Sequence, residues 1–295
     1  KRLRKFSSAA GDAITVPQYL GNRFLSKSNA LQVICAIIFF VCFTIYVASA
    51  YVAGASVFTA IFPSLSSHAA MIIFALAMLL ITFFGGFKAV CWTDFFQGIL
   101  MFAALMTVPI VIAITKDMDP AALSVVYSYK DAVSGEMVEC SFGTGLFDAS
   151  WQDIISGLAW GLGYFGMPHI LVRFMSIEKP SMVKKSATVA IIWVICALGC
   201  ACLIAYFGRM FLAEELLTAG AQKMVFIDFA RKLFPSFIAG ILMAAIIAAS
   251  MSTADSQLLV ASSSFTSDIY KPIIRKDADE KEILWVGRII VVIVA

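Results

Sequence analysis

The sequence predicts an all-α polytopic membrane protein. Of its 295 residues, 61% are hydrophobic and only 14% are charged. Several apolar runs reach the ~20 residues that a helix needs to span a bilayer. These runs do not alternate polar and apolar residues, so they do not fit a transmembrane β-barrel. We therefore expect a single transmembrane domain over residues 1–295, embedded in the lipid bilayer.

The apolar runs give the membrane spans in order along the chain. We expect spans at about 30–62, 69–87, 92–115, 152–174, 187–212 and 236–264, with a seventh that begins near residue 283. Before the first span, Thr15 is placed to cap a short surface helix that has Pro17 in its first turn. The chain begins without Met and ends inside an apolar run. We therefore expect an internal fragment that lacks the N-terminal and C-terminal helices.

The basic residues orient these spans. Sixteen of the 22 Lys and Arg residues lie in one set of alternate loops, which comprises residues 1–29, Lys88, 173–185 and 271–288. The positive-inside rule places this set in the cytoplasm. We therefore expect a multi-pass protein of the plasma or inner membrane, with residues 1–29 cytoplasmic. The net charge of +3 is an orientation signal and does not suggest a nucleic-acid partner.

The loop from Lys116 to Trp151 is long and acidic, and it lies outside in this topology. A solvated connector is one interpretation, and a gate or vestibule lining is the other. Its acidic residues are Asp117, Asp119, Asp131, Glu136, Glu139 and Asp148.

Motifs for enzymatic chemistry are absent from the sequence. Six of the seven cysteines lie in or beside apolar runs, which predicts packing rather than disulfide or metal roles. There is no phosphate-binding loop, no HExxH or CxxC pair and no Gly-x-Ser-x-Gly elbow. We therefore expect no enzymatic activity and no organic cofactor.

A polar stripe interrupts the apolar segment that ends near residue 264. Ala249, Ser252, Thr253 and Ser256 share one helical face because they recur at i, i+3, i+4 and i+7. Hydroxyl and carbonyl oxygens are hard, neutral ligands that suit a sodium ion held and then released. The alternative is hydroxyls bonded back to their own helix at a helix–helix contact. Asp255 lies off the stripe, and one interpretation places it at the cytoplasmic helix end.

The segment Gly157–His169 holds four glycines and a proline, which predict a discontinuous helix. Transporters use such breaks to present backbone groups to a substrate at mid-membrane depth. Trp160 and Tyr164, at i and i+4, would line one side. The alternative is a close helix crossing made by the glycines. His169 fits a packing or hydrogen-bonding residue, with Arg173 as its helical neighbour.

Two further positions are candidates for function. Gly85 and Gly86 predict a tight turn between two spans, and Asp94 enters the second of them. Asp94 is a candidate either for capping that helix or for an ion path. Tyr46 lies within the first span, where an aromatic side chain usually serves packing.

Several motifs resemble the sodium/solute symporter family, in its bacterial sodium/proline branch. They are GLGYFGMPHILVRFMS (Gly161–Ser176), MSTADSQLLVASSSFTSDIYK (Met251–Lys271) and GGFKAVCWTDFFQ (Gly85–Gln97). The resemblance covers essentially the whole chain. It implies the leucine-transporter-type five-plus-five inverted-repeat fold, with this chain holding the third to eighth core helices and the start of the ninth.

The resemblance also implies roles for individual residues. The Ala249 carbonyl, Ser252 and Thr253 would bind sodium, and Asp94 would lie on the ion path. The residues that would line the substrate pocket are Tyr46, Trp160, Tyr164 and Pro168. The implied activity is sodium-coupled import of a small solute, with sodium as the coupling ion and L-proline as the favoured substrate.

Departures from the family pattern leave other solutes open. Met167 stands where the proline branch often has Gln, next to the pocket. A sodium symporter for pantothenate, a sugar or a carboxylate is therefore an alternative. A transporter-like sensor domain of a signalling kinase is another.

Overall fold

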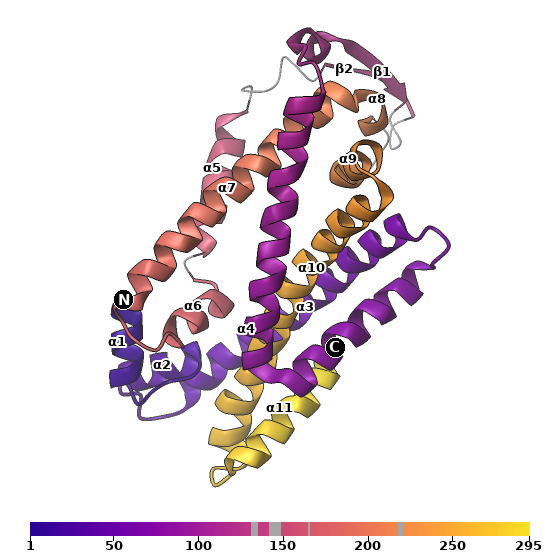
Figure 1. The fold of residues 1–295 in the computed structure, drawn as a ribbon. Coiled ribbons are helices and arrows are strands. Elements are labelled where there is room, and N and C mark those ends of the chain that lie inside the picture. Colours follow the sequence, from indigo (N-terminus) through magenta and orange to yellow (C-terminus); the bar gives the residue numbers. More distant parts are fainter. Residues whose placement is uncertain (131–134, 142–148, 165, 218–220) are drawn as a thin grey trace. The chain divides into compact units, whose positions relative to one another are not determined.

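Long apolar segments form α-helices here because a helix satisfies its own backbone N–H and C=O groups, which lipid cannot do. A computed structural model describes residues 1–130, 135–141, 149–164, 166–217 and 221–295 (Figure 1). The α-helices are α1 (Arg2–Ala9), α2 (Val16–Arg23), α3 (Ala30–Ile61), α4 (Ser67–Thr115), α5 (Trp151–Tyr164), α6 (Pro168–Met175), α7 (Met182–Phe211), α8 (Ala213–Leu216), α9 (Val225–Leu233), α10 (Ser236–Phe265) and α11 (Glu280–Val294).

The structure bears out a multi-pass membrane protein. Among the described residues, five helical segments are long and apolar enough to cross a membrane. They are Ala30–Ile61, Ser67–Thr115, Trp151–Met175, Met182–Phe211 and Ser236–Ile274. The last of these joins α10 to η3, a π-helical segment over Thr266–Ile274. The predicted seventh span corresponds to α11, which begins at Glu280 rather than near residue 283.

Helix α4 contains two of the predicted spans. Its 49 residues would extend about 73 Å as one straight helix, more than twice the ~30 Å hydrocarbon core. At Gly86 the backbone leaves the helical region, with φ 56° and ψ −161°. Only glycine adopts this conformation readily because it has no Cβ. Gly86 thus makes the predicted break, and helix resumes directly after it without an intervening loop.

The chain forms two compact units. The first comprises Lys1–Gly98, Gly163–Val189 and Ile247–Ala295, and the second comprises Ile99–Leu162 and Ala190–Ile246. In the first unit, α3, α4 and α10 pack around a buried core of Val47, Tyr51, Phe74, Met78, Ala254 and Leu258. Beside this core lies a smaller cluster of Phe43, Val260 and Ala261.

The second unit has its own core, which includes Val108 and Ile112 of α4, Ile204 and Phe207 of α7, and Leu242 of α10. Helices α8 and α9 pack at its edge, together with η2 (Ala221–Met224). Lys232 of α9 donates a hydrogen bond to Glu215 of α8, and this bond lowers the pKa of the Glu215 carboxyl.

The predicted acidic connector contains secondary structure that the sequence analysis missed. After the short 3₁₀ helix η1 (Pro120–Ser124), strands β1 (Val126–Lys130) and β2 (Met137–Ser141) pair antiparallel, with Val126 opposite Ser141. Asp131 and Asp148 lie outside the described residues. The alternating sequence Val-Tyr-Ser-Tyr-Lys of β1 was a signal for a strand.

The linker before α3, residues 1–29, contains the short helix that the sequence predicts, which is α2. Thr15 caps α2, and its Oγ1 accepts a hydrogen bond from the Gln18 backbone N–H at 3.2 Å. Pro17 lies in the first turn, where its missing N–H leaves no helical bond unmade.

The break at Gly86 gives a stability prediction. A Cβ added at this position meets no atom within 4 Å, so Gly86→Ala tests backbone strain alone. We expect this substitution to lower the free energy of unfolding of the full-length protein by about 1–3 kcal/mol. The loss should appear as a lower midpoint of thermal unfolding in detergent. Gly98→Ala in the same helix also meets no atom within 4 Å, and it should raise stability slightly. Equal midpoints for the two variants would contradict the assigned break.

Candidate ion and solute site

The polar stripe on α10 brings the three predicted sodium ligands together. The backbone carbonyl of Ala249 accepts hydrogen bonds from Ser252 Oγ at 3.1 Å and from Thr253 Oγ1 at 3.2 Å. Each hydroxyl donates its one proton to this carbonyl and keeps its lone pairs as acceptors. Oxygen ligands about 2.4 Å from a cation, at right angles to each other, would lie about 3.4 Å apart. The hydrogen bonds from these hydroxyls to their own helix, one of the two alternatives left open by the sequence, are therefore present. The distances between the three oxygens also fit one face of an ion site.

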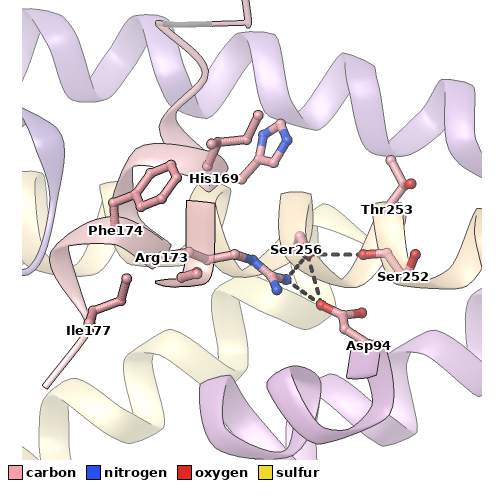
Figure 2. A pocket seen from close by; sticks show the side chains of 10 residues that line it. Asp94, His169, Arg173, Phe174, Ile177, Ser252, Thr253 and Ser256 are labelled. Atoms are coloured by element: carbon pink, nitrogen blue, oxygen red, sulfur yellow. Dashed lines mark hydrogen bonds and ion pairs between the residues drawn. The ribbon is translucent and has the colours of Figure 1, made fainter. Parts of the chain in front are cut away.

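One turn further along α10, Ser256 joins a charged pair. Arg173 of α6 donates to the carboxylate of Asp94 in α4 and, at 2.7 Å, to Ser256 Oγ (Figure 2). Ser256 Oγ lies 2.9 Å from the carbonyl of Ser252 and 3.4 Å from Asp94 Oδ2. The Asp94 side chain is only 10% exposed. The guanidinium therefore supplies the counter-charge that a carboxylate within a membrane span requires.

A cavity of about 390 Å³ connects the stripe with this pair. Its volume is in the range of small-molecule sites. Its walls come from α4, α6, α7 and α10 and the turn after α6, all in the first unit. The lining residues are Asp94, His169, Ile170, Arg173, Phe174, Ile177, Ser186, Ser252, Thr253 and Ser256 (Figure 2).

The discontinuous helix is present where the glycines predict it. Helix α5 ends at Tyr164, and α6 begins at Pro168, which is buried in its first turn. Between them, the Gly166 N–H donates to the Gly163 carbonyl at 3.1 Å, and the Met167 N–H donates to the Tyr164 carbonyl at 3.3 Å. Phe165 lies outside the described residues. The break sets the start of α6, and so places His169 and Arg173 at the cavity.

The four predicted substrate residues do not share this cavity. Trp160 belongs to the second unit and is 63% exposed. Tyr46 is 40% exposed and Tyr164 is 50% exposed, and neither lines the cavity. The Tyr46 ring packs against Phe43 at 6.5 Å, and the Phe43 ring meets the His169 ring edge-on at 5.9 Å. Tyr46 therefore reaches the start of α6 through one intervening ring.

Three sequence interpretations need correction. Asp94 does not cap a helix, because it lies eight residues beyond the break at Gly86, inside α4. Asp255 is not at a helix end: it is fully buried inside α10, where its Oδ1 accepts from Thr82 Oγ1 at 2.7 Å. Arg173 is the residue that the sequence analysis missed, because it was paired with His169. A carboxylate predicted inside a span was the signal that an Arg would be its partner.

The donor set fits an alkali cation better than a transition metal. Within the described part of the chain, no group of three or more His, Cys, Asp or Glu could hold a metal ion. The stripe offers neutral oxygens, which sodium accepts as ligands.

The Asp94–Arg173 pair gives a second prediction. Removing one charge leaves the other partly buried and unpaired, so Arg173→Gln and Asp94→Asn should each destabilise the protein. The double variant should lose less unfolding free energy than the sum of the losses in the two single variants. The difference, the coupling free energy, should be about 1–3 kcal/mol for unfolding in detergent.

The control for this cycle is the exposed pair Glu178–Lys179, whose charged atoms lie 3.9 Å apart. Its side chains are 79% and 70% exposed, so the same cycle there should give a coupling close to zero. Additive losses at Asp94 and Arg173 would show that the pair makes no net contribution.

Comparison with known proteins supplies the family. A model described as the sodium:solute symporter family matches residues 2–295. The sodium/proline symporter of Escherichia coli (strain K12) is 40% identical over 298 residues, covering 100% of this chain and 57% of that protein. The high-affinity proline transporter PutP of Bacillus subtilis (strain 168) is 38% identical over 294 residues, covering 100% of this chain and 60% of that protein. The chain thus spans about three fifths of the length of these relatives.

A solved structure has the same fold. It is the substrate-bound, outward-open state of a Na⁺-coupled sialic acid symporter, with a TM-score of 0.72 and 20% sequence identity. The match covers 99% of this chain and 61% of that chain. It bears out the predicted leucine-transporter-type fold.

Proposed function

Because the chain belongs to the sodium:solute symporter family, we propose that the full-length protein is a sodium-coupled secondary active transporter. It imports a small solute by alternating access. L-proline is the favoured solute because the relatives at about 40% identity are named as proline symporters or transporters. A family of symporters moves its solutes without converting them, in keeping with the expectation that the chain is not an enzyme.

The observation that carries the ion assignment is the convergence of Ala249, Ser252 and Thr253 on one face of α10. Their neutral oxygens bind sodium as the coupling ion. Three ligands are fewer than a hard cation takes, so the remaining ligands come from elsewhere in the full-length protein. A site without a fixed carboxylate holds the ion weakly enough to release it.

Asp94 is the next position that the ion contacts after it leaves the stripe. Ser256 links it to the stripe, since its hydroxyl lies near both the Ser252 carbonyl and the Asp94 carboxylate. Arg173 competes with the ion for this carboxylate and prevents it from trapping the cation. The ion then passes into the cavity that these residues line.

The solute is bound by Tyr46, Trp160, Tyr164 and Pro168 around the broken helix. Aromatic faces and a proline ring suit a small, partly apolar solute such as proline. Met167 lies at the break itself and affects the choice of solute. In this proposal residues 1–29 are cytoplasmic and the protein lies in the plasma membrane.

The driving force is sufficient for this activity. One sodium ion moving down ~100 mV provides ~2.3 kcal/mol, and a tenfold sodium gradient adds ~1.4 kcal/mol. At one-to-one coupling, the total supports an accumulation of several hundredfold for a neutral zwitterion.

The test is uptake of labelled proline by the full-length protein in proteoliposomes, as a function of external sodium. Ser252→Ala and Thr253→Ala should each raise the half-saturating sodium concentration about tenfold or more, because each removes one ligand worth at least ~1.4 kcal/mol. Thr188→Ala is the matched control: its hydroxyl also bonds back to its own helix, at 3.0 Å from the Lys184 carbonyl, away from the stripe. Uptake indifferent to sodium, or to both stripe substitutions, would refute the ion assignment.

The solute assignment is tested separately by competition. Excess unlabelled proline should abolish the labelled uptake, whereas pantothenate, sugars and simple carboxylates should leave it unchanged. Sodium-dependent transport of one of these solutes in place of proline would keep the mechanism and change the substrate.

A further inference from the structure

A buried carboxylate in η3, just beyond the end of α10, lies far along the chain from its partners and outside the proposed ion and solute sites. Asp268 of η3 is fully buried, and its Oδ1 accepts from Thr15 Oγ1 at 2.7 Å and from Gln32 Nε2 at 2.8 Å. Thr15 belongs to the linker before α3 and is itself only 3% exposed. Within the described residues, Asp268 Oδ2 is buried without a hydrogen-bond partner.

The same segment, residues 1–29, also contacts the wall of the cavity. Arg4 of α1 donates through Nε to the backbone carbonyl of Ile177 at 2.5 Å, and Ile177 lines the cavity. Met175 at the end of α6 packs against Ala13 and Tyr19 of the linker. Residues 1–29 therefore tie the helix that carries Arg173 to the helix that carries the stripe.

We propose that Thr15, Gln32 and Asp268 form a latch that keeps the cavity closed toward the cytoplasm and opens when ion and solute are released. The three are positioning residues: they touch neither ion nor solute, and they set the distance between the ends of α6 and α10. The proposal rests on the transport function and orientation proposed above.

The hydrogen bonds of Asp268 to Thr15 and Gln32 suit a contact that opens and closes better than a permanent one. A carboxylate paired with Arg would be costly to separate, whereas this one is held by two neutral donors. When the contact opens, water can hydrate the carboxylate, including the oxygen that has no partner, and this offsets the lost hydrogen bonds. The closed and open arrangements are therefore close enough in free energy for ligands to shift their populations.

The backbone around Asp268 is also irregular. Residues Thr266–Ile274 form a π-helix that contains Pro272, and the Arg275 N–H donates to the Tyr270 carbonyl at 3.0 Å. Such wide turns are less regular than α-helix and recur at functional sites.

The test measures cytoplasmic access to the cavity without sodium or solute. A reporter, Ile170→Cys, is placed in the cavity wall of the full-length protein after its native cysteines are replaced. Its rate of alkylation by a membrane-impermeant maleimide is measured from the cytoplasmic side in inside-out vesicles. Because no transport is needed, the result is independent of whether proline is the substrate.

The substitutions separate the latch from the helix cap. Thr15→Asp keeps a capping acceptor but replaces the donor by a second carboxylate against Asp268. Gln32→Met removes the other donor at similar size. We expect Thr15→Asp to raise the alkylation rate about tenfold, equivalent to ~1.4 kcal/mol, and Gln32→Met to raise it severalfold.

Two controls complete the design. Thr15→Ser retains both the cap and the donor and should label like the parent. Ser8→Ala removes an exposed linker hydrogen bond to Asp12 that does not reach Asp268, and it should also have no effect. Parental rates in both Thr15→Asp and Gln32→Met would overturn the latch. If Thr15→Asp fails to fold, the milder Gln32→Met alone decides between the outcomes.

Discussion

The fold depends on one constraint: a polar group within the hydrocarbon region must find its partner inside the protein. Backbone groups meet this requirement by forming helices. Side-chain hydroxyls meet it by bonding to their own helix, as Ser252 and Thr253 do with the Ala249 carbonyl. The carboxylate of Asp94 meets it by pairing with the guanidinium of Arg173. Each feature to which we assign a function in the first unit is a polar group whose partner within the protein can be exchanged for an ion or for water.

The stripe and Asp94 meet this requirement in different ways, and the difference bears on the proposed ion path. The Ser252 and Thr253 hydroxyls have a hydrogen-bond partner, the Ala249 carbonyl, when no ion is present. The stripe without an ion therefore costs little free energy. They can still offer lone pairs to a cation, so binding needs no large rearrangement of α10. Asp94 without Arg173 would be far more costly when the ion is absent. In the proposed function, the guanidinium makes an acidic residue tolerable on the ion path, and the neutral stripe makes sodium binding reversible.

The sequence predicted the parts of the fold that local composition determines. Apolar run length identified the spans, and the glycines identified the breaks at Gly86 and between Tyr164 and Pro168. Spacing along one helix placed Ala249, Ser252 and Thr253 together. The contacts between distant segments were not predictable in this way. Nothing local to Arg173 shows that its partner is Asp94 rather than His169, and nothing local to Asp268 points to Thr15, 253 residues away. These contacts follow from how α4, α6 and α10 pack.

Helix α6 explains how residues 1–29 can affect the proposed ion path. It has only eight residues and rises about 12 Å, so its own hydrogen bonds contribute little to its position. Its start is set by the break and by buried Pro168, and its end by Met175 and the Arg4–Ile177 contact. Arg173 lies in the last turn, close to the end that the linker holds. In the proposed function, a displacement of that end would move the guanidinium away from Asp94 and Ser256. Opening of the proposed latch and release of the ion would then be parts of one motion of a short helix.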